Sequence, residues 1–220
     1  MGLWHITAHG IGGHAAHPQG TISAIGVLED YLLEHELVSP KEAEFLRFAV
    51  KVPHASDGSL LGVDADDGFF TPLTVVSGMV YTEDAHLVQT LDFRFPTNTT
   101  AAKLQAALQA QAEGVALIEM GPAAAPFYKN PASKELRACL DAYHTVSGES
   151  GLPYTIGGGT YARHFPNAVG FGPEDPHPGA FRPAFVGSIH GANEAASFDE
   201  LLEALKIYIV TLLNLEELEF

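Results

Sequence analysis

The sequence is poor in cysteine and in long apolar runs, and each shortage excludes a class of protein. Cys139 is the single cysteine, so no internal disulfide can form, which fits a reducing compartment. No window offers the roughly 20 apolar residues that a membrane helix needs, and the first ten residues lack the charged-then-apolar layout of a signal peptide. We therefore expect a cytoplasmic protein that does not enter a membrane.

Basic residues are also scarce, because acidic residues outnumber them more than two to one. The chain has 11 Lys and Arg against 27 Asp and Glu, which gives a formal net charge of −16 at pH 7. Such a charge repels phosphate backbones and anionic lipid surfaces, so we expect no nucleic acid and no membrane among the partners. The 46% hydrophobic content of the 220 residues is enough for a packed core in one large or two small domains.

The first 128 residues carry an order of strands and helices that predicts an α/β (α+β) domain. Apolar and polar residues alternate at strand spacing or recur at helical spacing, and capping boxes and turn residues separate the runs. The predicted elements are a strand over 3–9, helices over 21–35 and 40–50, strands over 74–82 and 87–95 joined by a hairpin turn, a helix after Thr100 and a strand over 115–120. This β-α-(α)-β-β-α-β order is that of a ferredoxin-like unit. The first helix is expected to have an acidic outer face, with Leu28 or Glu29 as alternatives on its inner stripe.

The second strand of the predicted hairpin presents an arginine on its open face. Leu91 and Phe93 share one face of the strand, whereas Asp92 and Arg94 share the other. The planar guanidinium of Arg94 matches a carboxylate in two hydrogen bonds, so this position suits an acidic ligand. The alternative is a surface ion pair between Arg94 and Asp92, which would contribute little.

The remaining residues, 129–220, read as a second domain that begins near Asn130-Pro131. A helix is predicted over 133–147, with Gly148 at its end, and a capping box at Ser197 starts a last helix. That last helix carries one apolar stripe, made of Leu202, Leu205, Ile209 and Leu212.

A glycine-rich segment between these two helices, residues 154–194, suits a site where the backbone approaches a ligand. Gly157, Gly158 and Gly159 stand between a strand-like run and a helix-like run, a pattern that leaves free N–H groups suited to a carboxylate. His190 follows among small residues, and neutral imidazole is a favoured zinc ligand. The alternative is a histidine with a purely local role in its loop.

Three pieces of this segment, GGGTYAR, FGPEDPHPG and IHGANE, resemble in this order the C-terminal end of the co-catalytic zinc exopeptidases. That family includes bacterial dipeptidases, carnosinases, carboxypeptidase G and succinyl-diaminopimelate desuccinylase, and GG-T-Y-A-R is most similar to the dipeptidase branch. The resemblance implies that His190 ligates one of two zinc ions and that the backbone of Gly179 contacts the substrate. Glu194 would orient His190 or respond to the dipole of the following helix.

The pattern Gly10-x-x-x-His14-Ala15-x-x-Pro18, followed by Ile22 to Ile25, resembles the lid signature of the same family. The resemblance implies that residues 1–128 are the lid or dimerisation domain and that 129–220 are the C-terminal part of the metallopeptidase catalytic domain. His14 would then stabilise the oxyanion, and Arg94 would hold the C-terminal carboxylate of the substrate. For His5, His9 and His17 we favour a plain polar role on a strand or in a loop.

The other zinc ligands of that family, and its general base, have no counterpart in this sequence. No His-x-Asp occurs, and the only adjacent glutamates are Glu216 and Glu217 near the end of the chain. A stable zinc site needs about three or four protein ligands, so we expect that the chain does not bind both zinc ions fully and is inactive alone. Its partner would be the missing N-terminal catalytic half or a second copy, as in a dimer.

These observations favour a fragment of a dipeptidase that uses metal-activated water to hydrolyse a peptide or amide bond next to a free carboxylate. The substrate would be a dipeptide or an N-acyl amino acid, and a desuccinylase or deacylase of the same family is an alternative. A second hypothesis is a non-catalytic peptide-binding or dimerisation module from a split or degraded gene. A third makes the N-terminal histidines, with His5 and His9, a transition-metal site of their own.

Overall fold

The computed structural model describes residues 5–172, 183–187 and 192–219, and the chain forms two compact units. Unit 1 comprises the chain up to Pro126 together with Thr155–Gly158, and unit 2 comprises Phe127–Tyr154 and Gly159–Phe220. The glycine-rich segment is therefore divided between the two units. The assignment of 1–128 to a lid and of 129–220 to part of a catalytic domain stays a prediction.

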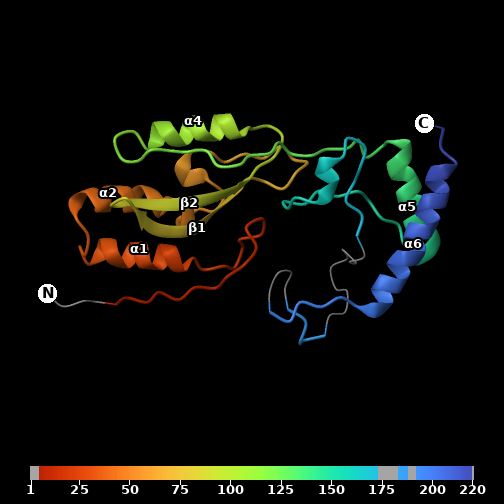
Figure 1. Ribbon diagram of the computed structural model, residues 1–220, viewed down its shortest axis with the longest axis horizontal. Helices are drawn as coiled ribbons and strands as arrows, with labels where there is room; N and C mark the ends of the chain where they lie inside the picture. Colours follow the sequence, from red (N-terminus) through yellow and green to blue (C-terminus); the bar gives the residue numbers. More distant parts are fainter. Residues whose placement is uncertain (1–4, 173–182, 188–191, 220) are drawn as a thin grey trace. The chain divides into compact units, whose positions relative to one another are not determined.

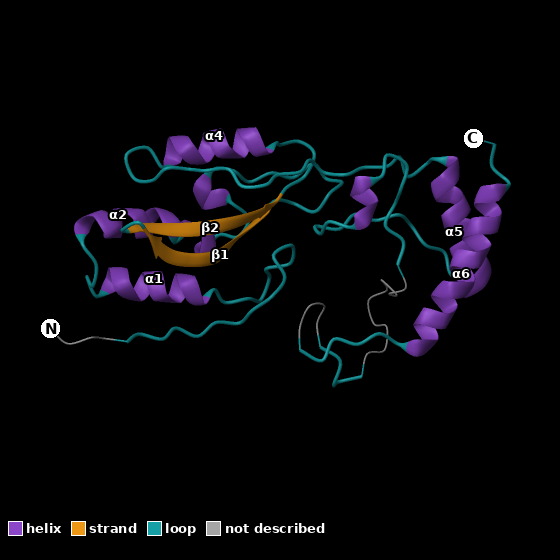
Figure 2. Ribbon diagram, in the orientation of Figure 1, coloured by secondary structure: helices purple, strands orange, loops and turns teal. Residues whose placement is uncertain are grey.

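Unit 1 consists of helices around one β-hairpin (Figures 1 and 2). In chain order its elements are α1 (Ala24–Glu34), α2 (Pro40–Ala49), α3 (Lys51–His54), the 3-10 turn η1 (Ser59–Leu61), β1 (Thr74–Glu83), β2 (His86–Arg94) and α4 (Ala101–Gln111). The predicted capping box at α2 is confirmed, because the Ser39 hydroxyl accepts from Glu42 N–H while the Glu42 carboxylate accepts from Ser39 N–H. In the view of Figure 1 the hairpin runs between α1 and α4.

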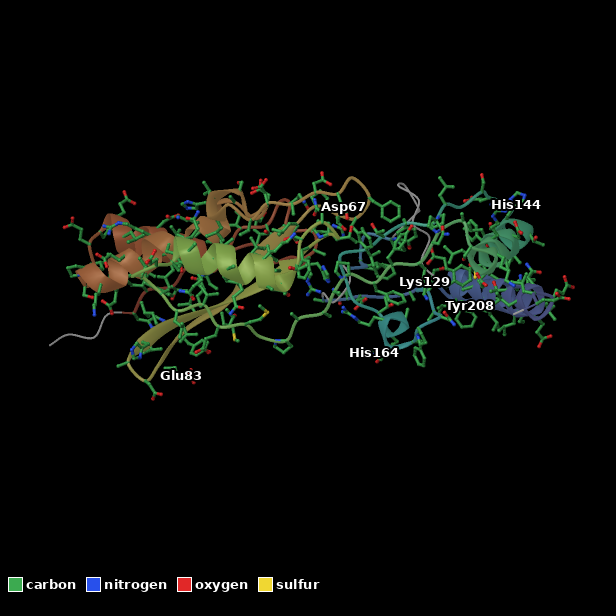
Figure 3. All side chains as sticks on the ribbon, turned by 90° about the horizontal axis from the view of Figure 1, so that it is seen from above. Asp67, Glu83, Lys129, His144, His164 and Tyr208 are labelled. Atoms are coloured by element: carbon green, nitrogen blue, oxygen red, sulfur yellow. The ribbon has the colours of Figure 1, made fainter. Side chains whose placement is uncertain are left out.

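The predicted hairpin is confirmed, and its register is set by a tight turn and one bulge. Asp84 and Ala85 have φ of 47° and 63°, the left-handed pair that a two-residue hairpin turn requires. Glu83 lies at the tip of the hairpin in Figure 3. The register shifts at Gly78, where Met79 N–H donates to the hydroxyl of Thr90 at 2.9 Å. Beyond the bulge, Thr74 pairs with Arg94 and Val75 with Phe93.

Mixed α and β structure is confirmed, but the ferredoxin-like sheet is not. Among the described residues only β1 and β2 form a sheet, and residues 5–9 and 115–120, within the further strands predicted over 3–9 and 115–120, do not join it. For residues 115–120 the reason is their hydrogen bonding to side chains of helix α4. Ile118 N–H donates to the side chain of Gln109 at 3.2 Å, and its carbonyl accepts from the side chain of Gln105 at 3.4 Å. Side-chain amides thus satisfy backbone groups that a neighbouring strand would otherwise pair.

The core of unit 1 lies between the hairpin and the helices and is built from large apolar side chains. Its buried members are Phe48, Val52, Leu61, Val63, Leu73, Val75, Leu104, Leu108 and Ala112. Leu91 and Phe93 of β2 pack against this cluster, so the predicted apolar face of the strand is confirmed. The opposite face of the hairpin, which carries Asp92 and Arg94, therefore points away from the core.

In helix α1 the position on the inner stripe that the spacing left open between Leu28 and Glu29 is taken by Glu29. Glu29 is 2% exposed, and no described residue hydrogen-bonds either oxygen of its carboxylate. Burial, with a further contribution from the Asp30 charge, raises the pKa of Glu29 to about 7, against an opposing effect of His54. The tight fit of α1 accounts for the position, because a Cβ on Gly26 would lie 2.5 Å from the Cβ of Pro53.

Unit 2 contains α5 (Lys134–Ser147), the 3-10 turn η2 (Tyr161–His164) and α6 (Phe198–Glu216). Gly148 ends α5 with φ 76°, as predicted, and α5 and α6 lie side by side (Figure 1). Asn214 of α6 donates to the carbonyl of Ala138 of α5 at 3.2 Å. Within the part of the chain that the structure describes, no helix combines the length and apolar character needed to cross a membrane.

Candidate functional site

Arg94, the last residue of β2, has a half-buried guanidinium whose hydrogen-bonding groups are only partly used. Its Nη2 donates to the carboxylate of Asp92 at 2.8 Å, so the ion pair considered as an alternative is present. The Nε of Arg94 is buried, and no acceptor for it exists among the described residues. Nε–H and Nη2–H together form one side of the guanidinium fork, which a carboxylate can engage with two parallel hydrogen bonds. A buried donor without a partner is costly, so this edge is suited to an incoming acidic group.

His14 lies in the loop between two extended residues, Ile11 and Ile22, that pair with each other. Their backbone groups exchange hydrogen bonds of 2.9 and 3.0 Å, which closes the base of the loop. Within the loop, Ala16 N–H donates to Nδ1 of His14 at 3.1 Å. A neutral imidazole that accepts at Nδ1 carries its proton on Nε2. This bond therefore makes His14 a hydrogen-bond donor through Nε2, which is the property that an oxyanion stabiliser needs.

The His14 loop is attached to the face of the hairpin that carries Arg94. The hydroxyl of Thr74 donates to the carbonyl of Ala15 at 3.0 Å. Thr74 is the register partner of Arg94, and directly opposed residues of an antiparallel pair project their side chains to the same face. Thr74 is only 7% exposed. The loop and the arginine are therefore brought to one side of the same two strands.

The first part of the glycine-rich segment packs against this loop within unit 1. Thr155 donates through its hydroxyl to the carbonyl of Phe69 at 3.3 Å. Gly157 lies so close to the loop that a Cβ there would be 2.6 Å from the Cβ of Ala16. Glycine is therefore required at 157 for a steric reason, as expected of a segment where backbones approach closely.

Asp67 reinforces the same end of the hairpin by joining the loop before β1 to the residues after β2. Its carboxylate accepts from the hydroxyl and the N–H of Thr97 and from the N–H groups of Phe69 and Phe70. These bonds, that of the Thr97 hydroxyl first, hold the pKa of Asp67 well below its usual range. Figure 3 labels Asp67 in this loop.

The site residues predicted in the second domain are not tested by this arrangement. Gly179 and His190 lie outside the described residues, and Glu194 is exposed. The segment after the glycines forms η2, which Thr160 caps through its hydroxyl, rather than the start of a longer helix. Across residues 5–172, 183–187 and 192–219 no three His, Cys, Asp or Glu side chains gather in a group that could hold a metal ion. The N-terminal histidines therefore gain no support as a metal site.

Two contributors to the site, Thr74 and Ala16, were missed by sequence reasoning. Thr74 could have been identified by its position at the start of β1, because it is the register partner of Arg94. Identifying that pairing from the sequence would have required the exact turn and the position of the bulge, since both set the register of the hairpin. Nothing in the sequence marks Ala16, since its role depends on its buried backbone.

Comparison with known proteins gives similarity to one kind of enzyme, although no family model matches the chain. The Beta-Ala-Xaa dipeptidase of Lactobacillus delbrueckii subsp. lactis is 26% identical over 205 residues, which cover 92% of this chain and 42% of that protein. A Staphylococcus aureus USA300 protein named as a dipeptidase is 24% identical over 218 residues, 97% of this chain and 45% of its own. Another dipeptidase-named protein, from Staphylococcus saprophyticus, is 34% identical over 98 residues, 44% of this chain and 19% of its own. The chain thus spans less than half the length of these relatives, and its similarity to dipeptidases extends over nearly all of its own residues.

Proposed function

We propose that this chain is part of a dipeptidase that hydrolyses a peptide or amide bond next to a free carboxylate. The names of the relatives support the reaction class. The observation that carries the substrate assignment is the buried Nε of Arg94, which has no acceptor among the described residues and lies beside Nη2. One oxygen of a terminal carboxylate would supply the acceptor that Nε lacks, and the other would accept from the neighbouring Nη2, which also donates to Asp92.

In this proposal two side chains of unit 1 act on different parts of one small substrate. Arg94 binds the terminal carboxylate through its Nε and Nη2 donors. His14 donates from Nε2 to the carbonyl oxygen of the bond to be cleaved, because Ala16 N–H keeps its Nδ1 as an acceptor. A donor placed where negative charge develops lowers the barrier by about 3 to 4 kcal/mol.

Two zinc ions belong to the proposal, with His190 as a ligand of one of them. Bound zinc would supply an activated water for attack on the carbonyl. The described residues do not fit such a centre by themselves, because no three ligating side chains gather among them. We therefore propose that the isolated chain lacks hydrolytic activity and that the remaining ligands come from the N-terminal catalytic half or from an oligomeric partner.

A peptide-binding module without catalysis is a second candidate. It is favoured by the fact that the carboxylate-binding edge of Arg94 is formed within unit 1, whereas the described residues assemble no metal ligands. A desuccinylase or deacylase would offer the same free carboxylate to Arg94, so the binding edge alone does not separate these substrates.

Calorimetric titration of the chain with N-acetylalanine and with its carboxamide tests the carboxylate assignment. We expect the carboxylate to bind and the uncharged carboxamide to bind at least ten-fold more weakly. Arg94→Gln should weaken carboxylate binding at least ten-fold, whereas Arg47→Gln, on the exposed side of α2, should leave it unchanged. Equal binding of the two ligands, or full binding by Arg94→Gln, would overturn the proposal. Strong zinc-dependent dipeptidase activity of the isolated chain would overturn the proposed need for further ligands.

A further inference from the structure

We propose that Thr74 is a positioning residue that fixes the donor state of His14 through the peptide group between Ala15 and Ala16. The importance of His14 for the reaction rests on the proposed function. The hydrogen-bond geometry and its test do not depend on that function.

The argument begins with the two bonds made by one peptide group. The carbonyl of Ala15 accepts from the Thr74 hydroxyl at 3.0 Å, and the N–H of Ala16 donates to His14 Nδ1 at 3.1 Å. This carbonyl and this N–H belong to the same peptide unit, which is planar and trans, so they point in opposite directions. Holding the carbonyl therefore fixes the direction of the N–H.

The bonds run in one direction from Thr74 to His14. The Thr74 hydroxyl donates to the peptide carbonyl, the peptide N–H donates to Nδ1, and the imidazole is left to donate through Nε2. Hydrogen bonds in such a chain polarise and strengthen one another. Without the Thr74 hydroxyl the Ala15 carbonyl is no longer held, so the Ala16 N–H is no longer fixed on Nδ1 of His14. Nδ1 and Nε2 then compete for the proton of the neutral ring.

Burial and packing keep this peptide group in place. Thr74 is 7% exposed and Ala16 is 2% exposed, so water is largely excluded around the peptide group itself, whereas the His14 ring is exposed to solvent. Gly157 packs directly on Ala16, because a Cβ at 157 would lie 2.6 Å from the Ala16 Cβ. Any side chain at 157 therefore displaces Ala16 or the glycine segment. By contrast, a Cβ on Gly158 meets nothing closer than the Cδ1 of Ile156, at 4.0 Å.

The same threonine links the two proposed substrate contacts. Thr74 is paired with Arg94 across the hairpin and bonded to the loop of His14. Its loss should disturb the His14 donor while leaving Arg94 on its strand. In a complete active enzyme, Thr74→Val should therefore lower kcat at least ten-fold and change KM less than three-fold.

The test uses the 220-residue chain without any ligand. The ¹⁵N shifts of the His14 ring and the exchange rate of the Ala16 amide are measured at alkaline pH, where an unperturbed imidazole is neutral. We expect the wild-type ring to be in the Nε2–H form. Thr74→Val should move the ring shifts toward a mixture of tautomers and speed exchange of the Ala16 amide at least ten-fold. Thr74→Ser, which keeps the hydroxyl, should restore both signals, and Thr82→Val, at an exposed position of β1, should change neither.

If Thr74→Val does not fold, the variants Gly157→Ala and Gly158→Ala test the proposal instead. Gly157→Ala should shift the His14 ring signals, whereas Gly158→Ala should not. The proposal is overturned if the wild-type His14 ring is in the Nδ1–H form. It is also overturned if Thr74→Val folds and leaves the His14 ring signals unchanged. If Thr74→Val does not fold, unchanged ring signals in Gly157→Ala overturn it. None of these outcomes depends on carboxylate binding, so a failure here is distinct from a failure of the proposed function.

Discussion

Units 1 and 2 use their apolar side chains in opposite ways. Unit 1 buries large ones, and Leu61 and Leu73 are each 1% exposed. In the described part of unit 2 the buried apolar residues are Ala138, Ala142, Ala162, Ala204 and Ile207. Apart from Ile207, large apolar side chains of α6 stay exposed, with Leu205 at 54% and Leu212 at 63% exposure.

This difference indicates which unit can stand by itself. Burial of large apolar groups is the main stabilising term in folding, about 25 cal/mol per Å² of apolar surface. Unit 1 therefore has its own core, whereas unit 2 keeps an apolar helix face of the kind that marks an interaction surface. The residues that we place in the carboxylate site, Arg94 and His14, belong to the unit with the core.

The largest effect should come from the core of unit 1. Leu73→Ala removes a side chain that is 1% exposed and should lower the free energy of unfolding by about 2 to 5 kcal/mol. Leu212→Ala on α6 is the matched change at 63% exposure, and we expect less than about 0.5 kcal/mol. Urea unfolding followed by circular dichroism checks both. If both variants lose the same free energy of unfolding, the two units do not differ in how they bury large apolar side chains.

A somewhat smaller effect should come from the buried carboxylate of Glu29. Its folded pKa of about 7 exceeds the ordinary 4.5, so the folded state binds more protons between these values and stability falls as pH rises through that window. Glu29→Gln should remove this loss and gain up to about 3 kcal/mol at pH 8, with no gain at pH 4. Glu34→Gln, exposed on the same helix, is the control. The interpretation fails if Glu29→Gln leaves the pH dependence between 4.5 and 7 unchanged.

Helix caps should have a smaller effect that again differs between the units. Ser39→Ala breaks the capping box of α2 and should cost unit 1 about 1 kcal/mol. Ser197→Ala removes the equivalent cap of α6, where the Ser197 hydroxyl accepts from Glu200 N–H. Because α6 packs mainly on small residues, we expect that change to appear as faster amide exchange in its first turn rather than as lost global stability. A lower unfolding midpoint for unit 1 in Ser197→Ala would contradict this.

The smallest effect on stability should come from the exposed face of α6. Leu205→Gln combined with Leu212→Gln should leave the free energy of unfolding nearly unchanged and reduce self-association in light scattering. This result would support the prediction that a partner covers the face. If wild-type and variant chains are both monodisperse monomers, a second copy is excluded as that partner.

Local features of the fold could be predicted from the sequence, whereas features that depend on distant residues could not. The capping box at Ser39 and the end of α5 at Gly148 were predicted because the deciding residues lie within one turn of each other. The strand predicted over 115–120 does not form among the described residues, since the backbone at Ile118 bonds to side chains of α4 instead. The apolar stripe predicted for α6 does not form its buried face, because its members Leu202, Leu205, Ile209 and Leu212 are exposed while Ala204, Ile207 and Thr211 are buried.

The candidate site shows the same limit. The open face of Arg94 followed from strand alternation, and the structure places Asp92 beside it as the alternation requires. The bond from Thr74 to Ala15 joins residues 59 positions apart and could not be seen before the loop was placed. The helical spacing left Leu28 or Glu29 open for the inner stripe of α1, and the choice of Glu29 depends on how Gly26 fits against Pro53.

The central claim is that Arg94 and His14 bind the same small carboxylic acid, from one side of the hairpin. The most direct measurement is an NMR titration of the chain with N-acetylalanine, following the Arg94 Nε–H and the His14 ring nitrogens together. The account predicts that both signals shift with a single dissociation constant and that neither shifts with the carboxamide. If the Arg94 signal stays still, or if the two signals report different affinities, the claim is contradicted.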